Sequence, residues 1–438
     1  MSSKRLKVLL IVEHCNPEWA STPLIGYNFF KAISQLVDAT LVTHERNREV
    51  LEKIKPSENI IYISESNFTK KYYRLIESIS SIIPKEALRR PLDVVISYPI
   101  FAEFINQVCD KFRGQIEAGD YDIVHVITPV HTRYPIKIFK ACKHTPFILG
   151  PVNGGVPFPE WFEEVAIKKY LDISFLIEFV RLITPGYKET YQQAGKILVG
   201  SAFTLNKLKN ILKIPEDKFE LLAENGISEV SVNEGKKIRS KNGHFNLLFV
   251  GRLVAFKCAD ILIEAVSRLK GAIKSKVIVT IVGDGSERSK LEKRVQDLDL
   301  GNIVKFVGWV LPEQTINYYN QADIFCFPSV RESGGAVALE AMACGLPCIV
   351  ANNGGLSEYL TEETGFKIEP LSREYLTQEL TNKIEIMLEN EQLRESMSAK
   401  AIERAKEFTW ESKARRIVKI YRENIERNSF ESKTDNLV

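Results

Sequence analysis

The chain has 438 residues, of which 45% are hydrophobic and 26% are charged. A chain of this length usually forms two or three domains, and this composition is ordinary for a globular protein. The 59 Lys and Arg residues nearly balance the 56 Asp and Glu residues. This balance argues against a protein that binds nucleic acid through bulk positive charge.

The sequence also argues against export and against a membrane span. No apolar run reaches the ~18 residues of a spanning helix, and no signal peptide precedes the first predicted strand, which begins by Lys7. The seven cysteines are odd in number and scattered, a pattern that favours reduced thiols. We therefore expect a cytoplasmic protein.

Short runs rich in Val, Ile and Leu alternate with helical stretches from the beginning of the chain. The runs that predict strands are 8–12, 40–43, 59–63, 123–128, 147–150, 197–200 and 219–222. Such runs are typical of strands that are buried on both faces. With helices between them, they predict βαβ units and a parallel sheet.

A polar stretch, residues 229–244, interrupts this alternation and predicts a linker. The alternation then restarts, with predicted strands at 245–251, 277–283, 303–307, 322–328, 348–351 and 366–368. The sequence thus predicts an α/β protein with two Rossmann-like, doubly wound domains. The first covers residues 1–228 with helical insertions, the second covers 245–408, and a helix and tail follow at 409–438.

The first candidate site follows the predicted strand that ends at Gly251. Arg252 comes directly after it and Lys257 a few residues later. Ligands of open α/β sheets bind beyond the carboxyl ends of the strands. An arginine that bridges phosphate oxygens and a lysine that adds a point charge would suit a diphosphate there. Two exposed surface cations are the alternative.

The second candidate site surrounds the start of an apolar helix. Ser333, Gly334 and Gly335 precede this helix and could offer bare N–H groups to an anion. Glu332 stands just outside the helix and Glu340 inside it. One carboxylate could bind sugar hydroxyls and the other a ribose. A capped helix with one buried, hydrogen-bonded glutamate is the alternative.

Two further loops are expected at the same edge of the second sheet. Gly283 and Gly285 follow a strand, but no third glycine completes the spacing of a dinucleotide-binding oxidoreductase. The loop that ends at Trp309 could let backbone groups read a base. Each loop is a weak signal alone, and their joint placement favours one nucleotide site.

The order and spacing of these motifs resemble the retaining family 4 glycosyltransferases, also called glycosyl transferases group 1. The resemblance rests on Gly251-Arg252-Leu253 with Lys257, Val282-Gly283-Asp284-Gly285, the pair Glu332 and Glu340, and Gly354-Gly355 with Glu358. It covers nearly all of the second domain. It implies the GT-B fold with a central cleft, a C-terminal helix that crosses back, a nucleotide-diphosphate sugar as donor, and retention of the anomeric configuration.

The same resemblance implies roles for single residues. Arg252 and Lys257 would hold the diphosphate, Glu332 would contact the donor sugar, and Glu340 the ribose. No cofactor and no essential metal are implied, so we interpret the DxD triplets at 120–122 and 297–299 as coincidental. Cys258 stands where the family usually has glycine, and we expect its side chain to narrow the phosphate loop.

The first domain offers fewer candidates. Asn153, Gly154 and Gly155 follow a predicted strand and could approach the transferred sugar or the acceptor, with a strand-end turn as the alternative. His125 resembles a histidine that the family brings to the donor, which makes it a catalytic candidate. The family often has a second histidine two residues later, where this chain has Ile127, and the nearby His131 could substitute for that second histidine. A histidine on a buried strand is more often structural.

Two stretches of the first domain, 68–90 and 161–188, mix basic residues with aromatic and aliphatic ones. They could dock on an anionic membrane or pack inside the domain. The working hypothesis is a retaining hexosyltransferase with a glycan or lipid-linked acceptor, in cell-surface polysaccharide or glycolipid biosynthesis at the inner face of the membrane. A non-catalytic partner subunit and an oxidoreductase are the alternatives, and no nucleic-acid partner is expected.

Overall fold

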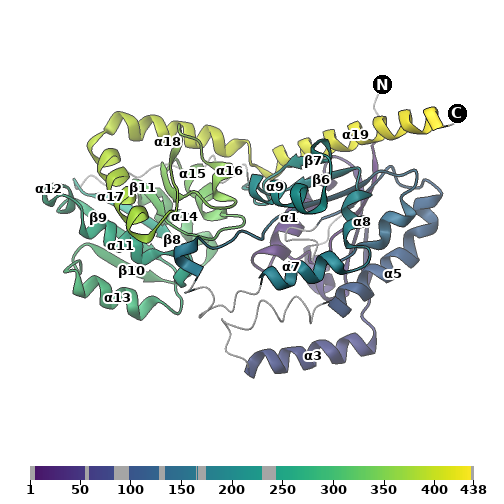
Figure 1. Cartoon of the computed structure of the whole chain (residues 1–438), viewed down its shortest axis with the longest axis horizontal. Helices are drawn as coiled ribbons and strands as arrows, with labels where there is room; N and C mark the ends of the chain where they lie inside the picture. The colour runs from purple at the N-terminus through teal and green to yellow at the C-terminus, as the bar shows by residue number, and fades with distance from the viewer. Residues whose placement is uncertain are drawn as a thin grey trace. The chain divides into compact units, whose positions relative to one another are not determined.

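The computed structural model describes residues 5–54, 59–82, 98–127, 134–163, 165, 174–228 and 243–435. Its contacts divide the chain into two compact units (Figure 1). Unit 1 contains Met1–Gly155, Glu164–Glu224 and Trp410–Val438, and unit 2 contains Val156–Glu163 and Asn225–Thr409. Most of the expected linker, residues 229–244, lies outside the described residues.

Unit 1 is built on a seven-stranded sheet in the order β3-β2-β1-β4-β5-β6-β7. All the neighbouring strands are parallel, as the continuous apolar runs predict. The strands are β1 (Lys7–Ile11), β2 (Asp38–His44), β3 (Asn59–Ile63), β4 (Ile123–Val126), β5 (Phe147–Val152), β6 (Lys196–Val199) and β7 (Phe219–Leu221).

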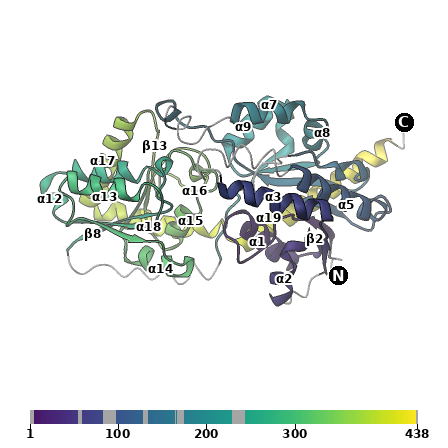
Figure 2. The ribbon, with the colours of Figure 1, turned by 90° about the horizontal axis from the view of Figure 1, so that it is seen from below.

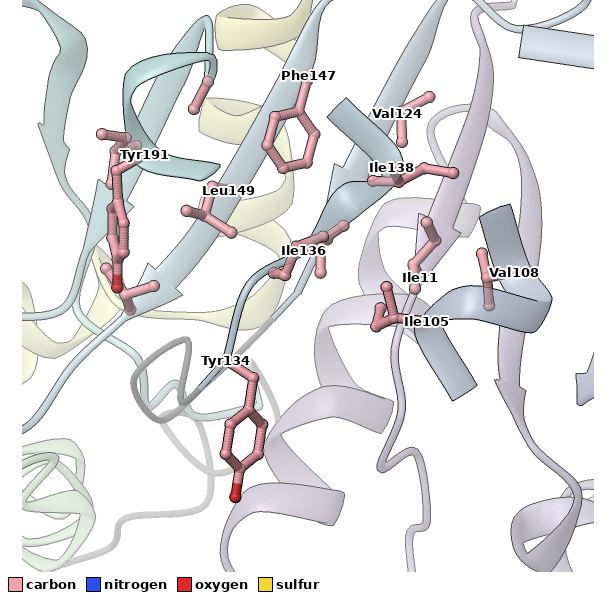
Figure 3. Packing of buried hydrophobic residues seen from close by; sticks show 14 of the residues in the cluster. Ile11, Ile105, Val108, Val124, Tyr134, Ile136, Ile138, Phe147, Leu149 and Tyr191 are labelled. Atoms are coloured by element: carbon pink, nitrogen blue, oxygen red, sulfur yellow. The ribbon is translucent and has the colours of Figure 1, made fainter. Parts of the chain in front are cut away.

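Helices cover both faces of this sheet. The helices of unit 1 are α1 (Thr22–Ser34), α2 (Arg48–Ile54), α3 (Asn67–Ile82), α5 (Tyr98–Glu117), α7 (Ser174–Ile183), α8 (Tyr187–Gln192), α9 (Ala202–Leu212) and α19 (Trp410–Asp435). On one face, Ile105 and Val108 of α5 pack with Ile11 and Val124 of the sheet (Figure 3). This apolar layer is closed to water and fixes α5 on the sheet.

The other face of the unit 1 sheet is covered by α1 and the C-terminal helix α19 (Figure 2). The ring of Trp410, the first residue of α19, meets Phe29 of α1 edge-on at 5.1 Å. Further along α19, Ile417 and Tyr421 are completely buried in the same layer. The expected return of the C-terminal helix to the first domain is thus confirmed.

Unit 2 is built on a six-stranded sheet in the order β10-β9-β8-β11-β12-β13, again with all strands parallel. The strands are β8 (Phe245–Val250), β9 (Val277–Val282), β10 (Val304–Gly308), β11 (Ile324–Phe327), β12 (Cys348–Ala351) and β13 (Gly365–Ile368). The strand order reverses between β8 and β11. At such a reversal the loops after two neighbouring strands diverge and leave a crevice for a ligand.

Most helices of unit 2 lie between these strands in the chain, and α17 and α18 follow the last strand. The helices of unit 2 are α11 (Ala259–Ser267), α12 (Gly271–Lys274), α13 (Arg288–Asp297), α14 (Pro312–Gln321), α15 (Ala336–Ala343), α16 (Leu356–Tyr359), α17 (Arg373–Glu389) and α18 (Glu391–Lys406). Two doubly wound α/β units are therefore confirmed. Across the part of the chain that the structure describes, every helix is too short or too polar to cross a membrane.

Candidate functional site

A pocket of about 580 Å³ opens in unit 2 beyond the carboxyl ends of β8, β9 and β10. Its lining combines residues from three strand-end loops with residues of α14 and α15. Among them are Gly251, Arg252, Gly283, Asp284, Trp309, Tyr319 and Glu340. Five residues singled out in the sequence thus meet at one pocket: Gly251, Arg252, Gly283, Trp309 and Glu340.

Glycines let the loops after β8 and β9 touch backbone to backbone. Gly283 has a φ of 131°, and a β-carbon added there would meet the carbonyl oxygen of Gly251. A β-carbon at Gly285 would meet the carbonyl oxygen of Leu253. The Leu253 N–H donates to the carbonyl oxygen of Asp284 at 2.9 Å. This close approach of the two backbones leaves no room for a side chain at Gly283 or Gly285.

Charged groups stand at the rim of the pocket. Arg252 is exposed and makes no ion pair with any residue in the described ranges. Asp284 accepts a hydrogen bond from the Gly285 N–H at 2.7 Å and forms an ion pair with Arg288 at 3.0 Å. These two donors hold the pKa of Asp284 below its usual range. Arg252 is therefore the rim cation that remains available to an anionic ligand.

Glu340 lines the pocket from inside α15. The Tyr319 hydroxyl of α14 donates to Glu340 Oε2 at 2.8 Å. Burial raises the pKa of the Glu340 carboxyl, and the hydrogen bond from Tyr319 opposes that rise. Tyr319 is the partner that a carboxylate in so apolar a helix requires. The apolar sequence around Glu340 predicts a hydrogen-bond partner but does not show that this partner is Tyr319.

Lys257 and Glu332 form an ion pair beside the pocket. Their side chains are only 12% and 17% exposed, and neither residue lines the 580 Å³ pocket itself. The Lys257 ammonium also lies 5.0 Å from the centre of the Phe327 ring. The fold thus joins a cation after β8 to a carboxylate after β11, 75 residues apart in the chain.

Cys258 follows Lys257 with a φ of 54°, in the left-handed region that favours glycine. Its thiol is 1% exposed, and Sγ lies 3.4 Å from the Ala255 carbonyl oxygen. The side chain therefore fills the interior of its own turn. The backbone keeps the conformation expected for glycine, although a cysteine occupies the position.

The loop before α15 is pressed against the loop after β12. The Gly355 N–H donates to the Glu332 carbonyl oxygen at 2.9 Å. A β-carbon at Gly355 would meet the carbonyl oxygen of Ser333, and Gly335 is the N-cap of α15, with a φ of 62°. Ser333 is half-buried, and Gly334 and Gly335 are buried. These contacts fix the backbone of Glu332 just before the N-terminus of α15.

His125 lies in the interior of unit 1 and is completely buried. Its Nδ1 is 2.6 Å from the Tyr421 hydroxyl of α19, and its Nε2 is 2.8 Å from the Gly150 carbonyl oxygen. Burial lowers the pKa of His125 to about 4. With both ring nitrogens occupied, this geometry favours the structural alternative over the catalytic role. The other candidate, His131, lies outside the described residues.

Asn153 is also buried within unit 1, at 1% exposure. Its Oδ1 accepts hydrogen bonds from the Gly154 N–H at 2.8 Å and from the hydroxyls of Ser201 and Thr204 at 3.2 and 3.1 Å. The amide oxygen is therefore used inside the unit, where it joins the end of β5 to the start of α9. Gly154 and Gly155 follow with φ values of 114° and 69°.

Comparison with known proteins relates the second unit to a protein family and gives the fold of the chain. Residues 232–404 match the family model of the glycosyl transferases group 1. An uncharacterized glycosyltransferase of Methanocaldococcus jannaschii is 29% identical over 285 residues, which cover 61% of this chain and 68% of that relative. A D-inositol 3-phosphate glycosyltransferase of Corynebacterium aurimucosum is 30% identical over 179 residues, 40% of this chain and 42% of that relative. The match thus spans less than half of the corynebacterial protein.

Among solved structures, that of Anabaena HepE in complex with UDP superimposes with a TM-score of 0.61 at 17% sequence identity. The superposition covers 95% of this chain and 99% of that one, so it includes both sheets. The family match, in turn, includes every strand-end loop that forms the pocket. Residues 232–404 thus match the glycosyl transferases group 1, and the whole chain has the GT-B fold.

Proposed function

We propose that the protein is a retaining hexosyltransferase that takes a nucleotide-diphosphate sugar as its donor. The observation that carries this proposal is the pocket of unit 2, in which Arg252 and Glu340 meet beside the Lys257–Glu332 pair. The pocket is large enough for a nucleoside, and its free rim cation suits a diphosphate. HepE, which has the same fold, was solved with UDP, which supports a donor of this class.

Each group has a part in the proposed reaction. Glu340 binds the ribose, Trp309 and the neighbouring backbone receive the base, and Arg252 and Lys257 hold the diphosphate. Glu332 contacts the sugar. The acceptor hydroxyl attacks the anomeric carbon on the face that the diphosphate leaves, and its proton passes to the departing phosphate oxygen. The cations and the N-terminus of α15 stabilise the charge that develops there. We propose that neither a cofactor nor a metal takes part.

A non-catalytic partner subunit and an oxidoreductase remain the competing functions. Donor-dependent release of nucleoside diphosphate separates the three. Purified protein is incubated with UDP-, GDP- and ADP-linked hexoses, and the free diphosphate is measured with and without a mixture of bacterial glycolipids. Release from one donor class is expected for the transferase. Nucleotide binding without release would instead favour the partner subunit, and hydride transfer to a nicotinamide would favour the oxidoreductase.

We propose a glycan or lipid-linked acceptor, used at the inner face of the membrane to build a cell-surface polysaccharide or glycolipid. Helix α3 supports this proposal. It lies outside the layers of unit 1 (Figure 1) and exposes 69% of Phe68 and 56% of Leu75. The exposed Lys70, Lys71 and Arg74 share this helix. Apolar side chains among cations suit an anionic bilayer surface, where each cation adds about 1 kcal/mol.

The docking proposal is tested by co-sedimentation with vesicles of phosphatidylserine and phosphatidylcholine at low and high salt. The variant Lys70→Glu with Lys71→Glu should lose binding. Lys290→Glu with Lys293→Glu makes the same charge change on exposed positions of α13 in unit 2 and serves as the matched control. Equal binding by the two double variants, or no binding of wild type at low salt, would favour a soluble acceptor.

A further inference from the structure

One short segment of the chain belongs to a different unit from the residues on either side of it. Residues Val156–Glu163, here named the strap, make their contacts within unit 2. The chain before the strap, up to Gly155, and the chain after it, from Glu164, belong to unit 1. The chain therefore leaves unit 1 after Gly155, contributes the strap to unit 2 and returns to unit 1 from Glu164.

Three aromatic side chains anchor the strap. Phe158 and Phe162 are only 6% and 5% exposed, and their rings stack at 5.1 Å with 20° between the planes. The Trp161 indole N–H donates to the Pro370 carbonyl oxygen at 2.8 Å. Buried aromatic residues of this size hold a short segment in a fixed position.

The strap is seated on the loops that carry Glu332 and Lys257. The guanidinium carbon of Arg331, which precedes Glu332, lies 4.3 Å from the centre of the Phe158 ring. The Phe158 ring also meets the ring of Phe256, which precedes Lys257, at 6.2 Å. One phenylalanine thus contacts the chain neighbour of each member of the ion pair.

The strap also contacts the loop after β12. The Asn353 amide donates to the carbonyl oxygens of Pro157 and Val330. A β-carbon at Gly354 would meet both the Glu332 carbonyl oxygen and a methyl group of Val156. The loop after β12 therefore contacts both the strap and the backbone of residues 330–332.

The origin of the strap in unit 1 is equally well fixed. Asn153 is held by Ser201 and Thr204, and only Gly154 and Gly155 separate it from Val156. Both glycines have positive φ values. Two glycines at positive φ thus join the held Asn153 to the strap.

We propose that the strap is a positioning element for the transfer step and that Phe158 is its positioning residue. Phe158 fixes Arg331 and Phe256 and thereby sets where Glu332 and Lys257 stand when the donor sugar arrives. This proposal rests on the proposed function, because the positioned residues are those that would contact the sugar and the diphosphate. The nucleoside pocket lies apart from the strap, since no strap residue lines it.

The test compares Phe158→Ala with Phe245→Ala. Phe245, at the amino end of β8, also carries an arginine over its ring, with 4.9 Å between Arg394 Cζ and the ring centre. It therefore controls for the loss of one phenylalanine–arginine contact in unit 2. Phe158→Ala should lower kcat about tenfold or more and leave UDP and GDP binding within about twofold. Phe245→Ala should leave kcat unchanged, and Phe158→Tyr should restore it.

Hydrogen exchange supplies an arm that does not depend on turnover. The Val330 N–H donates to Phe256 and the Gly355 N–H to Glu332, both at 2.9 Å. Exchange at these two amides should quicken about tenfold or more in Phe158→Ala but not in Phe245→Ala. Unchanged exchange, or equal kcat in the two alanine variants, overturns the strap proposal. Quickened exchange in a protein that never releases nucleoside diphosphate would uphold the positioning and contradict the proposed function instead.

Discussion

Neutralising Glu332 and neutralising Glu340 should have different effects on nucleotide binding and on turnover. Glu332 pairs with Lys257, whereas Glu340 accepts a hydrogen bond from Tyr319 inside the pocket. If Lys257 binds the donor diphosphate, it must weaken its pairing with Glu332 when nucleotide arrives. Neutralising Glu332 removes that competition, and neutralising Glu340 removes a charged acceptor from the proposed ribose site.

The exposed fractions of the pair set the magnitude. Exposed ion pairs contribute up to about 1 kcal/mol, and removing one partner of a fully buried pair costs about 3–5 kcal/mol. The side chains of Lys257 and Glu332 are 12% and 17% exposed, so water still reaches both groups. We therefore take about 1 kcal/mol as the contribution of this ion pair. Glu332→Gln should therefore bind nucleoside diphosphate up to about fivefold more tightly, yet lose about a hundredfold or more in turnover. Glu340→Gln should bind it about five- to tenfold more weakly, because it exchanges a charged hydrogen-bond acceptor for a neutral one.

Isothermal titration calorimetry with UDP and with GDP measures both binding constants, and donor-dependent diphosphate release measures turnover. Thermal unfolding of each variant confirms that the fold is kept. Equal losses of nucleotide affinity in Glu332→Gln and Glu340→Gln would refute the division of roles. A Glu332→Gln variant with wild-type turnover would remove Glu332 from the sugar site altogether.

Three further changes have definite expected outcomes. Lys257→Ala should lower kcat by about a hundredfold or more, because a charge-assisted contact to the leaving diphosphate is lost; wild-type rates of diphosphate release in a folded variant would contradict this. Gly283→Ala should destabilise the protein by about 2–4 kcal/mol in denaturant titrations, because its β-carbon meets the Gly251 carbonyl at a φ of 131°, whereas Gly301→Ala, with nothing within 4 Å, should not. Burial lowers the pKa of Lys413 from 10.5 to about 7, against the opposing pull of Glu224. From pH 7 to 10 the unfolded chain therefore binds a proton that the folded chain lacks, and wild-type stability should rise by about 4 kcal/mol relative to Lys413→Met; parallel pH profiles would contradict this.

The architecture was predictable because every buried parallel strand carries its own signal. Runs such as 8–12 and 277–283 are apolar on both faces, and only a sheet covered by helices on both sides buries them. The pocket was predictable for a related reason. Residues after neighbouring parallel strands must meet at one edge, so Arg252, Gly283 and Trp309 could be grouped without coordinates.

Contacts between distant segments were not predictable in the same way. His125 forms a hydrogen bond with Tyr421, which lies 296 residues later in the chain. The sequence of the strand that carries His125 does not predict that partner. Asn153 stands at a strand end and suggested an open cleft, but it is used by hydroxyls of α9. The strap was missed because its short run of prolines and aromatic residues has no helical or strand period. An aromatic-rich turn after Gly154-Gly155 was the one available signal.

The placement of α19 has a consequence for how the chain becomes a folded protein. Its Ile417 and Tyr421 belong to the interior of unit 1, although most of that unit is encoded before residue 225. A chain that emerges from the ribosome N-terminus first therefore cannot complete unit 1 until its last helix appears. Unit 2 has all its strands and the strap by Thr409, so it can fold earlier. A C-terminal truncation should accordingly expose the interior of unit 1 while it spares the pocket of unit 2.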